Sequence, residues 1–200
     1  MPHRYREIAF TDAVRIVQDE LGSAGMNAEA MEQSAPNDRL TETEALFLAR
    51  CESFYLASVS STGWPYVQHR GGPAGFIRVL GPERIGWAEF AGNRHYITTG
   101  NLRGDDRVSL FCMDYANRRR LKIFGHAQII GPDAPEMSGL AVPGYRARVD
   151  RGLVVTLEGF DWNCAQHIPQ RFSLAEVEAA SAVMLRRIEE LEAALAERGG

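Results

Sequence analysis

The sequence predicts a mostly β protein of the α+β class, in which an antiparallel barrel lies between helical segments. Seven short β-rich runs, separated by turn signals, lie between Phe54 and Phe160. Short strands with frequent turns favour a closed or partly closed barrel over a parallel α/β sheet. Helical patterns precede and follow these runs, so we expect an N-terminal helical extension at 1–40, a barrel domain at 41–172 and a long C-terminal helix at 173–200.

Composition narrows the class of protein. A chain of 200 residues, 45% of them hydrophobic, can form one core without disulfides. The three cysteines, Cys51, Cys112 and Cys164, are odd in number and follow no apolar leader, which argues against a secreted disulfide framework. A net charge of −4 argues against a nucleic-acid partner, and no apolar run approaches the roughly 20 residues that span a bilayer. We therefore expect a cytoplasmic protein with no nucleic-acid and no membrane partner.

Two helices are predicted before the barrel. Thr11 can cap the first helix, because its hydroxyl can accept a backbone N–H of the first turn. Residues 22–37 are loose and polar, which predicts a connecting loop. Thr41 and Glu44 fit a capping box, in which each side chain satisfies a free backbone donor near the other residue. A second helix is therefore expected to begin at Thr41.

The barrel segment divides into three hairpins and a seventh strand. Its β-rich runs are bounded by turn signals such as Thr62-Gly63. The expected strands are 54–60 and 64–69, 76–80 and 84–90, 108–113 and 121–130, and finally 153–160. One short helix, from His95 to Leu102, is expected inside this segment.

The last segment has the pattern of a long helix with one apolar stripe. Ser173 and Glu176 form another capping box at its start. Residues on the stripe recur at alternating spacings of three and four, the seam of a heptad repeat: Leu174, Val177, Ser181, Met184, Ile188, Leu191 and Leu195. Ser181 is the polar interruption. The helix would be roughly 36 Å long, and its stripe could pack on its own barrel or form a dimer contact.

Familiar catalytic motifs are absent from the sequence. The chain has no Gly-rich dinucleotide fingerprint, no Walker A loop, no zinc-protease helix motif and no nucleophile elbow. Its five histidines and three cysteines show no spacing typical of metal ligands. No nucleophile and base can be paired, so the catalytic residues are unknown and no metal is expected.

The strongest local feature is the segment Gln68–Phe76, which ends one strand and begins the next. Three glycines within five positions would expose backbone N–H groups and allow a ligand to approach closely. Arg70 adds a planar guanidinium group that matches phosphate oxygens. The alternative is a wide turn with a solvated arginine.

A second basic cluster is the loop Gly92-Asn93-Arg94-His95, which enters the short helix. Its backbone N–H groups and Arg94 could face an anion. Three residues of the helix add side-chain donors: Thr98, Thr99 and Asn101. The alternative is an ordinary helix cap.

A third basic cluster runs from Arg118 to Lys122 at the start of a strand. Alternation places Arg120 and Lys122 on the face opposite Leu121 and Ile123. Two cations on one strand face require solvent or an anion to compensate them, although a charge run is usually a solvated face. Three basic clusters in an acidic protein favour one shared anionic ligand.

The segment Asp161–Phe172 joins the last strand to the last helix and is rich in polar and aromatic groups. Cys164 could be a reactive thiol or a buried inert one. Trp162 could stack on the ring of a ligand or belong to the core.

Six motifs follow one another in a set order, and together they carry a resemblance. They are Gly63-x-Pro65, Arg70-Gly71-Gly72, Gly75-Phe76, Gly92-Asn93, Gly100-Asn101-Leu102 and Leu121-Lys122-Ile123-x-Gly125-x-Ala127. In this order the chain resembles the pyridoxamine 5′-phosphate oxidase-like, FMN-binding split-barrel family, over roughly Thr41 to Phe172. The resemblance implies an antiparallel split β-barrel that forms a homodimer with FMN at the subunit interface.

The resemblance also implies roles for single residues. Arg70 would lie along the flavin and its phosphate, and Gly71 and Gly72 would offer backbone groups. Asn93 and Arg94 would take the places of a serine and an arginine in the phosphate loop of the family.

The chain departs from the family at three further places. His95 replaces a lysine of the phosphate loop and loses a permanent charge. Arg120 and Lys122 take the places of a glutamine and an arginine near the flavin of the vitamin-oxidising enzymes. Those enzymes end in a segment that binds pyridoxal phosphate, to which Trp162 and Arg171 are only loosely comparable, so the resemblance does not extend to their substrate.

The function implied is that of an FMN-dependent oxidoreductase acting on an unknown small molecule, with the flavin supplying the chemistry. A non-catalytic flavin carrier or sensor is one alternative. A split-barrel protein that binds heme or the deazaflavin F420 is another. A heme would need an axial ligand, which four histidines could supply: His69, His95, His126 and His167.

Overall fold

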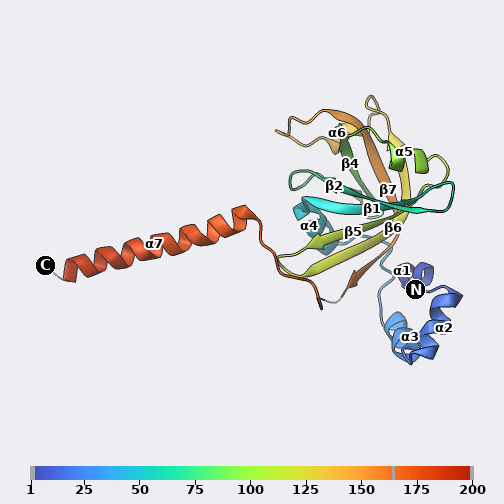
Figure 1. The fold of residues 1–200 in the computed structure, drawn as a ribbon, viewed down its shortest axis with the longest axis horizontal. Helices are drawn as coiled ribbons and strands as arrows, with labels where there is room; N and C mark the ends of the chain where they lie inside the picture. Colours follow the sequence, from blue (N-terminus) through green and yellow to red (C-terminus); the bar gives the residue numbers. More distant parts are fainter. Residues whose placement is uncertain (1–2, 164, 199–200) are drawn as a thin grey trace.

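The computed structural model describes residues 3–163 and 165–198, and one antiparallel sheet dominates it (Figure 1). The strands are β1 (Ser53–Val59), β2 (Pro65–Gly71), β3 (Arg78–Gly81), β4 (Arg84–Phe90), β5 (Arg107–Asp114), β6 (Arg119–Ile130) and β7 (Val149–Asn163). The helices are α1 (Arg4–Ala9), α2 (Asp12–Glu20), α3 (Ala24–Glu32), α4 (Glu42–Arg50), α5 (Ile97–Asn101), α6 (Met137–Leu140) and α7 (Leu174–Arg198). The order across the sheet is β2-β1-β5-β6-β7-β4-β3.

The sheet curls into a split barrel. Three strands separate β1 from β4 in the sheet, yet the rings of Phe54 and Trp87 meet with their centroids 4.9 Å apart. The end strands β2 and β3 are not hydrogen-bonded to each other within the described part of the chain, so the barrel does not close. The predicted fold class, an antiparallel split barrel of the α+β class with a long C-terminal helix, is confirmed.

The three predicted hairpins and the seventh strand are confirmed. β1 pairs with β2, β3 with β4, and β5 with β6, all antiparallel. β7 is longer than the expected 153–160, because its first half (149–156) pairs with β4 and residues 152–163 pair with β6. The predicted short helix is present as α5, whereas α6 was not expected.

Alternation along β6 divides its side chains between the barrel interior and the outer face. Leu121 and Ile123 are fully buried in the core. Arg120 and Lys122 lie on the opposite face and are only partly buried. The alternation predicted for this strand is therefore confirmed.

The N-terminal helices correct one prediction. Thr11 caps α2 as expected, since its hydroxyl accepts the Val14 N–H. The loop predicted for 22–37 is wrong, because α3 occupies much of it. α3 lacks an apolar period, but alanine, methionine and glutamate are good helix formers and supply most of its residues. Intrinsic propensity rather than amphipathicity explains this helix.

The capping box of α4 is confirmed and is tied to the far end of the chain. Glu44 is 4% exposed, and one of its carboxylate oxygens accepts the Thr41 backbone N–H at 2.8 Å. The other oxygen accepts the Trp162 Nε1–H, also at 2.8 Å. Burial by itself would raise the pKa of Glu44, but the hydrogen bonds from Thr41 and Trp162 outweigh burial and leave the pKa below its ordinary value of 4.5. Ionised Glu44 therefore stabilises both the cap and the packing of β7.

The substitution Glu44→Gln is expected to lower the free energy of unfolding at pH 7 by about 1.5–3 kcal/mol, the usual contribution of a hydrogen bond to a charged group. Because the folded pKa is depressed, this stabilisation is present above pH 4.5 and is lost as the pH falls through the folded pKa. Denaturant titrations should therefore show the variant and the parent converging in acid. Glu42→Gln, on an exposed residue of the same turn, is the control and should change little. If the variant were less stable than the parent by the same amount at pH 7 and in acid, this role of Glu44 would be contradicted.

The helix α7 begins at the predicted capping box. The Ser173 N–H donates to Glu176, and the Glu176 N–H donates to the Ser173 hydroxyl. α7 extends away from the barrel (Figure 1), and every side chain described between 174 and 196 is exposed. The alternative that its stripe packs on its own barrel is therefore wrong. None of the described helices is long and apolar enough to cross a membrane.

Candidate functional site

A cavity of about 320 Å³ lies where the end of β2, the end of β4, the following loop and the start of β7 meet. The curl of the sheet brings these segments together, although they lie far apart in the sequence. This volume is at the lower end of the range of about 300–1,000 Å³ that is typical of small-molecule sites. Four of the predicted site residues line it: Arg70, Gly71, Asn93 and Arg94.

Arg70 is the most buried cation of this cavity. Its side chain is 17% exposed, and Nη2 lies 2.7 Å from Oε1 of Glu89 on β4. Its Nε is buried and has no hydrogen-bond partner among the described residues. Burial lowers the pKa of Arg70, while the Glu89 carboxylate opposes that shift. Arg70 thus holds a charge in a poorly solvated place, with one donor still available.

Glu89 and Arg151 are site residues that the sequence analysis missed. They face each other in the β4–β7 register, with Arg151 Nε 3.8 Å from Glu89 Oε2. The Arg151 guanidinium also lies over the Tyr96 ring, 4.8 Å from its centroid. Burial raises the pKa of Glu89, and the two arginines act against that shift. No local motif marks either residue, since the pairing of β4 with β7 joins segments about 60 positions apart.

The loop between β4 and α5 presents two predicted residues to the cavity. Asn93 and Arg94 line it, and both are exposed to solvent. The Asn93 side-chain oxygen accepts the His95 N–H at 3.3 Å, which turns the chain back on itself. Arg94 and Tyr96 adopt left-handed backbone conformations with φ of 58° and 54°. Non-glycine residues in this region cost free energy, and such strain clusters at functional sites.

The polar residues of α5 mainly position the helix. The Thr98 hydroxyl donates to the Gln68 side chain of β2 at 3.1 Å. The Asn101 amide donates to Ser58 of β1 at 3.0 Å. The expectation that these two side chains are free donors is therefore wrong. Thr99 remains at the cavity wall, where its hydroxyl accepts a long hydrogen bond from Arg151.

The packing of the protein explains why residue 72 is a glycine. A Cβ at this position would lie 2.7 Å from the ring of Phe76, so close packing of that ring requires glycine. The Gly72 N–H donates to the Glu52 carbonyl at 2.9 Å. Unlike Gly71, it does not line the cavity. The backbone donor expected at Gly72 is therefore engaged within the protein.

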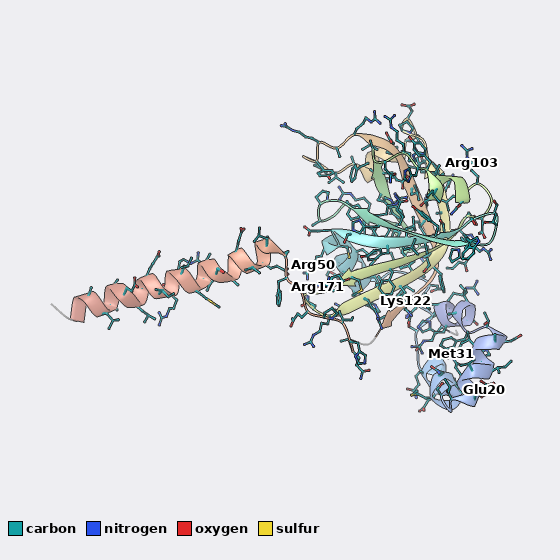
Figure 2. The ribbon with its side chains drawn as sticks, in the orientation of Figure 1. Glu20, Met31, Arg50, Arg103, Lys122 and Arg171 are labelled. Carbon is teal, nitrogen blue, oxygen red and sulfur yellow. The ribbon has the colours of Figure 1, made fainter. Side chains whose placement is uncertain are left out.

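Arg120 and Lys122 are not brought to this cavity. Lys122, labelled in Figure 2, places Nζ 3.0 Å from Oδ2 of the buried Asp161 and 4.8 Å from the centroid of the Tyr5 ring. His3 and Arg6 also approach Asp161, at 3.4 Å and 3.6 Å. The anion that compensates Lys122 is thus a carboxylate of its own chain, which fastens α1 to β6 and β7.

Within the segment Asp161–Phe172, Trp162 has a structural role. Its ring meets Phe47 edge-on at 4.8 Å, and the Arg119 guanidinium lies 4.3 Å from its centroid. It therefore packs at the edge of the core. Cys164, the other candidate of this segment, lies outside the described residues.

Residues 40–159 match the family described as pyridoxamine 5′-phosphate oxidase. The chain belongs to the pyridoxamine 5′-phosphate oxidase family. The matched region contains all four predicted residues that line the cavity, and it excludes α1–α3 and α7.

The chain is similar to several solved structures at low sequence identity. HupZ of Group A Streptococcus is 13% identical, with a TM-score of 0.51 over 66% of this chain and 99% of that chain. An FMN-binding protein from Syntrophomonas wolfei is 13% identical, with a TM-score of 0.47 over 76% and 97%. A protein of the pyridoxinephosphate oxidase family from Clostridium acetobutylicum is 14% identical, with a TM-score of 0.45 over 68% and 94%. No curated protein matches the chain.

This protein has a second cavity, which lies on the outer face of the barrel. It measures about 510 Å³, and its wall is mostly apolar around Phe124 of β6. His126 lies in it, with Nδ1 2.8 Å from Asp106 and Nε2 3.6 Å from Glu158. The described residues contain no cluster of three or more His, Cys, Asp or Glu side chains that could hold a metal ion.

Proposed function

We propose that the cavity at the end of β2 binds the phosphate group of FMN, and that the protein is an FMN-dependent oxidoreductase acting on a small molecule. One observation carries the proposal: Arg70, Arg94 and Arg151 come from three separate segments and line the same cavity. Arginine is the side chain best suited to phosphate, because its planar donors match the phosphate oxygens. Membership of the pyridoxamine 5′-phosphate oxidase family supports a flavin-type ligand.

The charges and donors of the cavity suit an anion. Its wall carries three arginines against two carboxylates, Glu89 and Asp150. The buried Arg70 Nε and Trp87 Nε1 lack hydrogen-bond partners in the described part of the chain, and both residues line the cavity. Buried donors without partners are costly, so an acceptor at this place is favourable. Glu89 would remain beside Arg70 and hold it toward the phosphate.

Bound FMN would supply the electron-transfer chemistry. The chain itself would hold the phosphate through Arg70 and Arg94, and Asn93 would contribute a polar side chain at the mouth. Family membership also favours a homodimer with the flavin at its interface, to which Arg120 would contribute from the outer face of β6, whereas Lys122 is already paired with Asp161. No residue is assigned a catalytic role.

The deazaflavin F420 and heme remain the alternative cofactors, and a non-catalytic carrier or sensor remains the alternative function. F420 also carries phosphate, so this cavity suits it as well. Heme would need an axial ligand, and the candidates lie apart: His69 lines this cavity, whereas His126 lies in the second one.

The experiment that tests the proposal is cofactor identification on the purified protein. We expect absorption bands of an oxidised flavin and the mass of FMN in the released ligand. If the protein is colourless, titrated FMN fluorescence should be quenched. A colourless protein that quenches no FMN fluorescence contradicts the proposal, and a heme spectrum selects the alternative. Bleaching of the flavin by NADH or NADPH would then distinguish an enzyme from a carrier.

A further inference from the structure

The apolar stripe of α7 is not covered by any described part of the chain. Its apolar members are between 47% and 74% exposed: Leu174, Val177, Met184, Ile188, Leu191 and Leu195. Figure 2 shows the side chains of α7 extending into solvent away from the barrel. Helices in proteins owe most of their stability to packing of an apolar face rather than to propensity. A helix of 25 residues with such a stripe therefore requires a partner surface.

The heptad phasing of the stripe indicates the kind of partner. Ile188 falls at position a and Leu191 at position d, a combination that favours parallel two-stranded coiled coils. Leu185, at an e position and 59% exposed, widens the stripe in the middle of the helix. Ser181, at an a position, is a polar interruption that lowers the stability of such a pair without changing its phasing.

Charges beside the stripe indicate the orientation. With the same phasing, Arg187 is at a g position and Glu192 is at the next e position. In a parallel, in-register pair, the g residue of one helix faces the next e residue of the other. Arg187 of each copy would then face Glu192 of the other copy. In an antiparallel pair g residues face g residues, and Arg187 would lose this partner.

We propose that α7 binds the α7 of a second copy of this chain as a parallel, in-register coiled coil. The stripe and its flanking charges carry the inference, which does not depend on the cofactor of the barrel. A barrel dimer could also hold two chains together, so the test must report on α7 itself.

Cysteine crosslinking tests the pairing and its orientation in the full chain. Cys51 and Cys112 are buried, so changing Cys164 to Ser leaves a suitable background. Leu191→Cys places thiols at a d position, where a parallel pair brings them together across the axis. Ala193→Cys, two residues away on the outer face, is the matched control. We expect the first variant to form a disulfide-linked dimer at least roughly tenfold faster than the control, because disulfides require close Cβ atoms. Equal rates, or no crosslinking of Leu191→Cys, would overturn the proposal.

Charge exchange tests the predicted register independently. Arg187→Glu alone should place like charges opposite each other and slow the Leu191→Cys crosslink by roughly fivefold. Adding Glu192→Arg to it should restore the rate, since the pair is then reversed. A rate that stays low in the double variant would contradict the parallel register, whereas FMN binding should be the same in all these variants.

Discussion

Replacing Arg70 by alanine is expected to weaken FMN binding by roughly a hundredfold, while riboflavin binding changes little. Riboflavin lacks the phosphate group, so the difference between the two ligands isolates the phosphate contact. Arg70 carries most of the effect because it is buried and charged and has an available donor at Nε. Fluorescence titration with each ligand measures both affinities.

Two controls separate phosphate binding from structural damage. Arg103→Ala removes an exposed arginine outside the cavity, labelled in Figure 2, and should leave FMN affinity unchanged. Arg70→Ala also leaves Glu89 with a weaker set of partners, which destabilises the fold. The double variant Arg70→Ala/Glu89→Gln removes that unpaired charge and should recover stability without recovering FMN affinity. Equal loss of FMN and riboflavin in the double variant would contradict the phosphate assignment.

Replacing Gly125 by alanine is expected to destabilise the fold by about 3 kcal/mol, at the upper end for an overpacked core position. Gly125 lies at the register shift of the β6–β7 pair. An added methyl group would overlap the backbone carbonyl oxygen of Thr156 and would lie 2.7 Å from the side chain of Val155. Backbone atoms on a paired strand cannot move aside as a flexible side chain can.

The matched control for Gly125 is Gly131→Ala, just beyond the end of β6. Nothing lies within 4 Å of a Cβ built there, and the backbone needs no positive φ. Its stability should change by less than about 1 kcal/mol. Urea denaturation of the two variants measures the difference. If Gly125→Ala unfolds at the same urea concentration as the control, the β6–β7 pairing in the structure is wrong at this point.

Local patterns in the sequence determined most of the elements. The three capping residues Thr11, Thr41 and Ser173 begin helices as predicted, because a cap depends only on groups within one turn. Alternation fixed which side of β6 faces the core for the same reason. α3 was missed because it has no apolar period and depends on propensity alone.

The composition of the site was decided by the tertiary structure. The sequence alone predicted four of the residues that line the cavity: Arg70, Gly71, Asn93 and Arg94. Glu89 and Arg151 join them only because β7 pairs with β4, and no local signal determines which distant strands become neighbours.

The ion pair of Lys122 depends on the same kind of long-range strand pairing. Its register opposite Asp161 on β7 gives it an internal anion, so it does not line the cavity with Arg70. In this protein the sequence by itself determined the strands, the helix caps and the clusters of basic residues, since these depend on neighbours in the chain. Only the tertiary structure decided which charges share a cavity, because that depends on how the sheet curls and which strand edges meet.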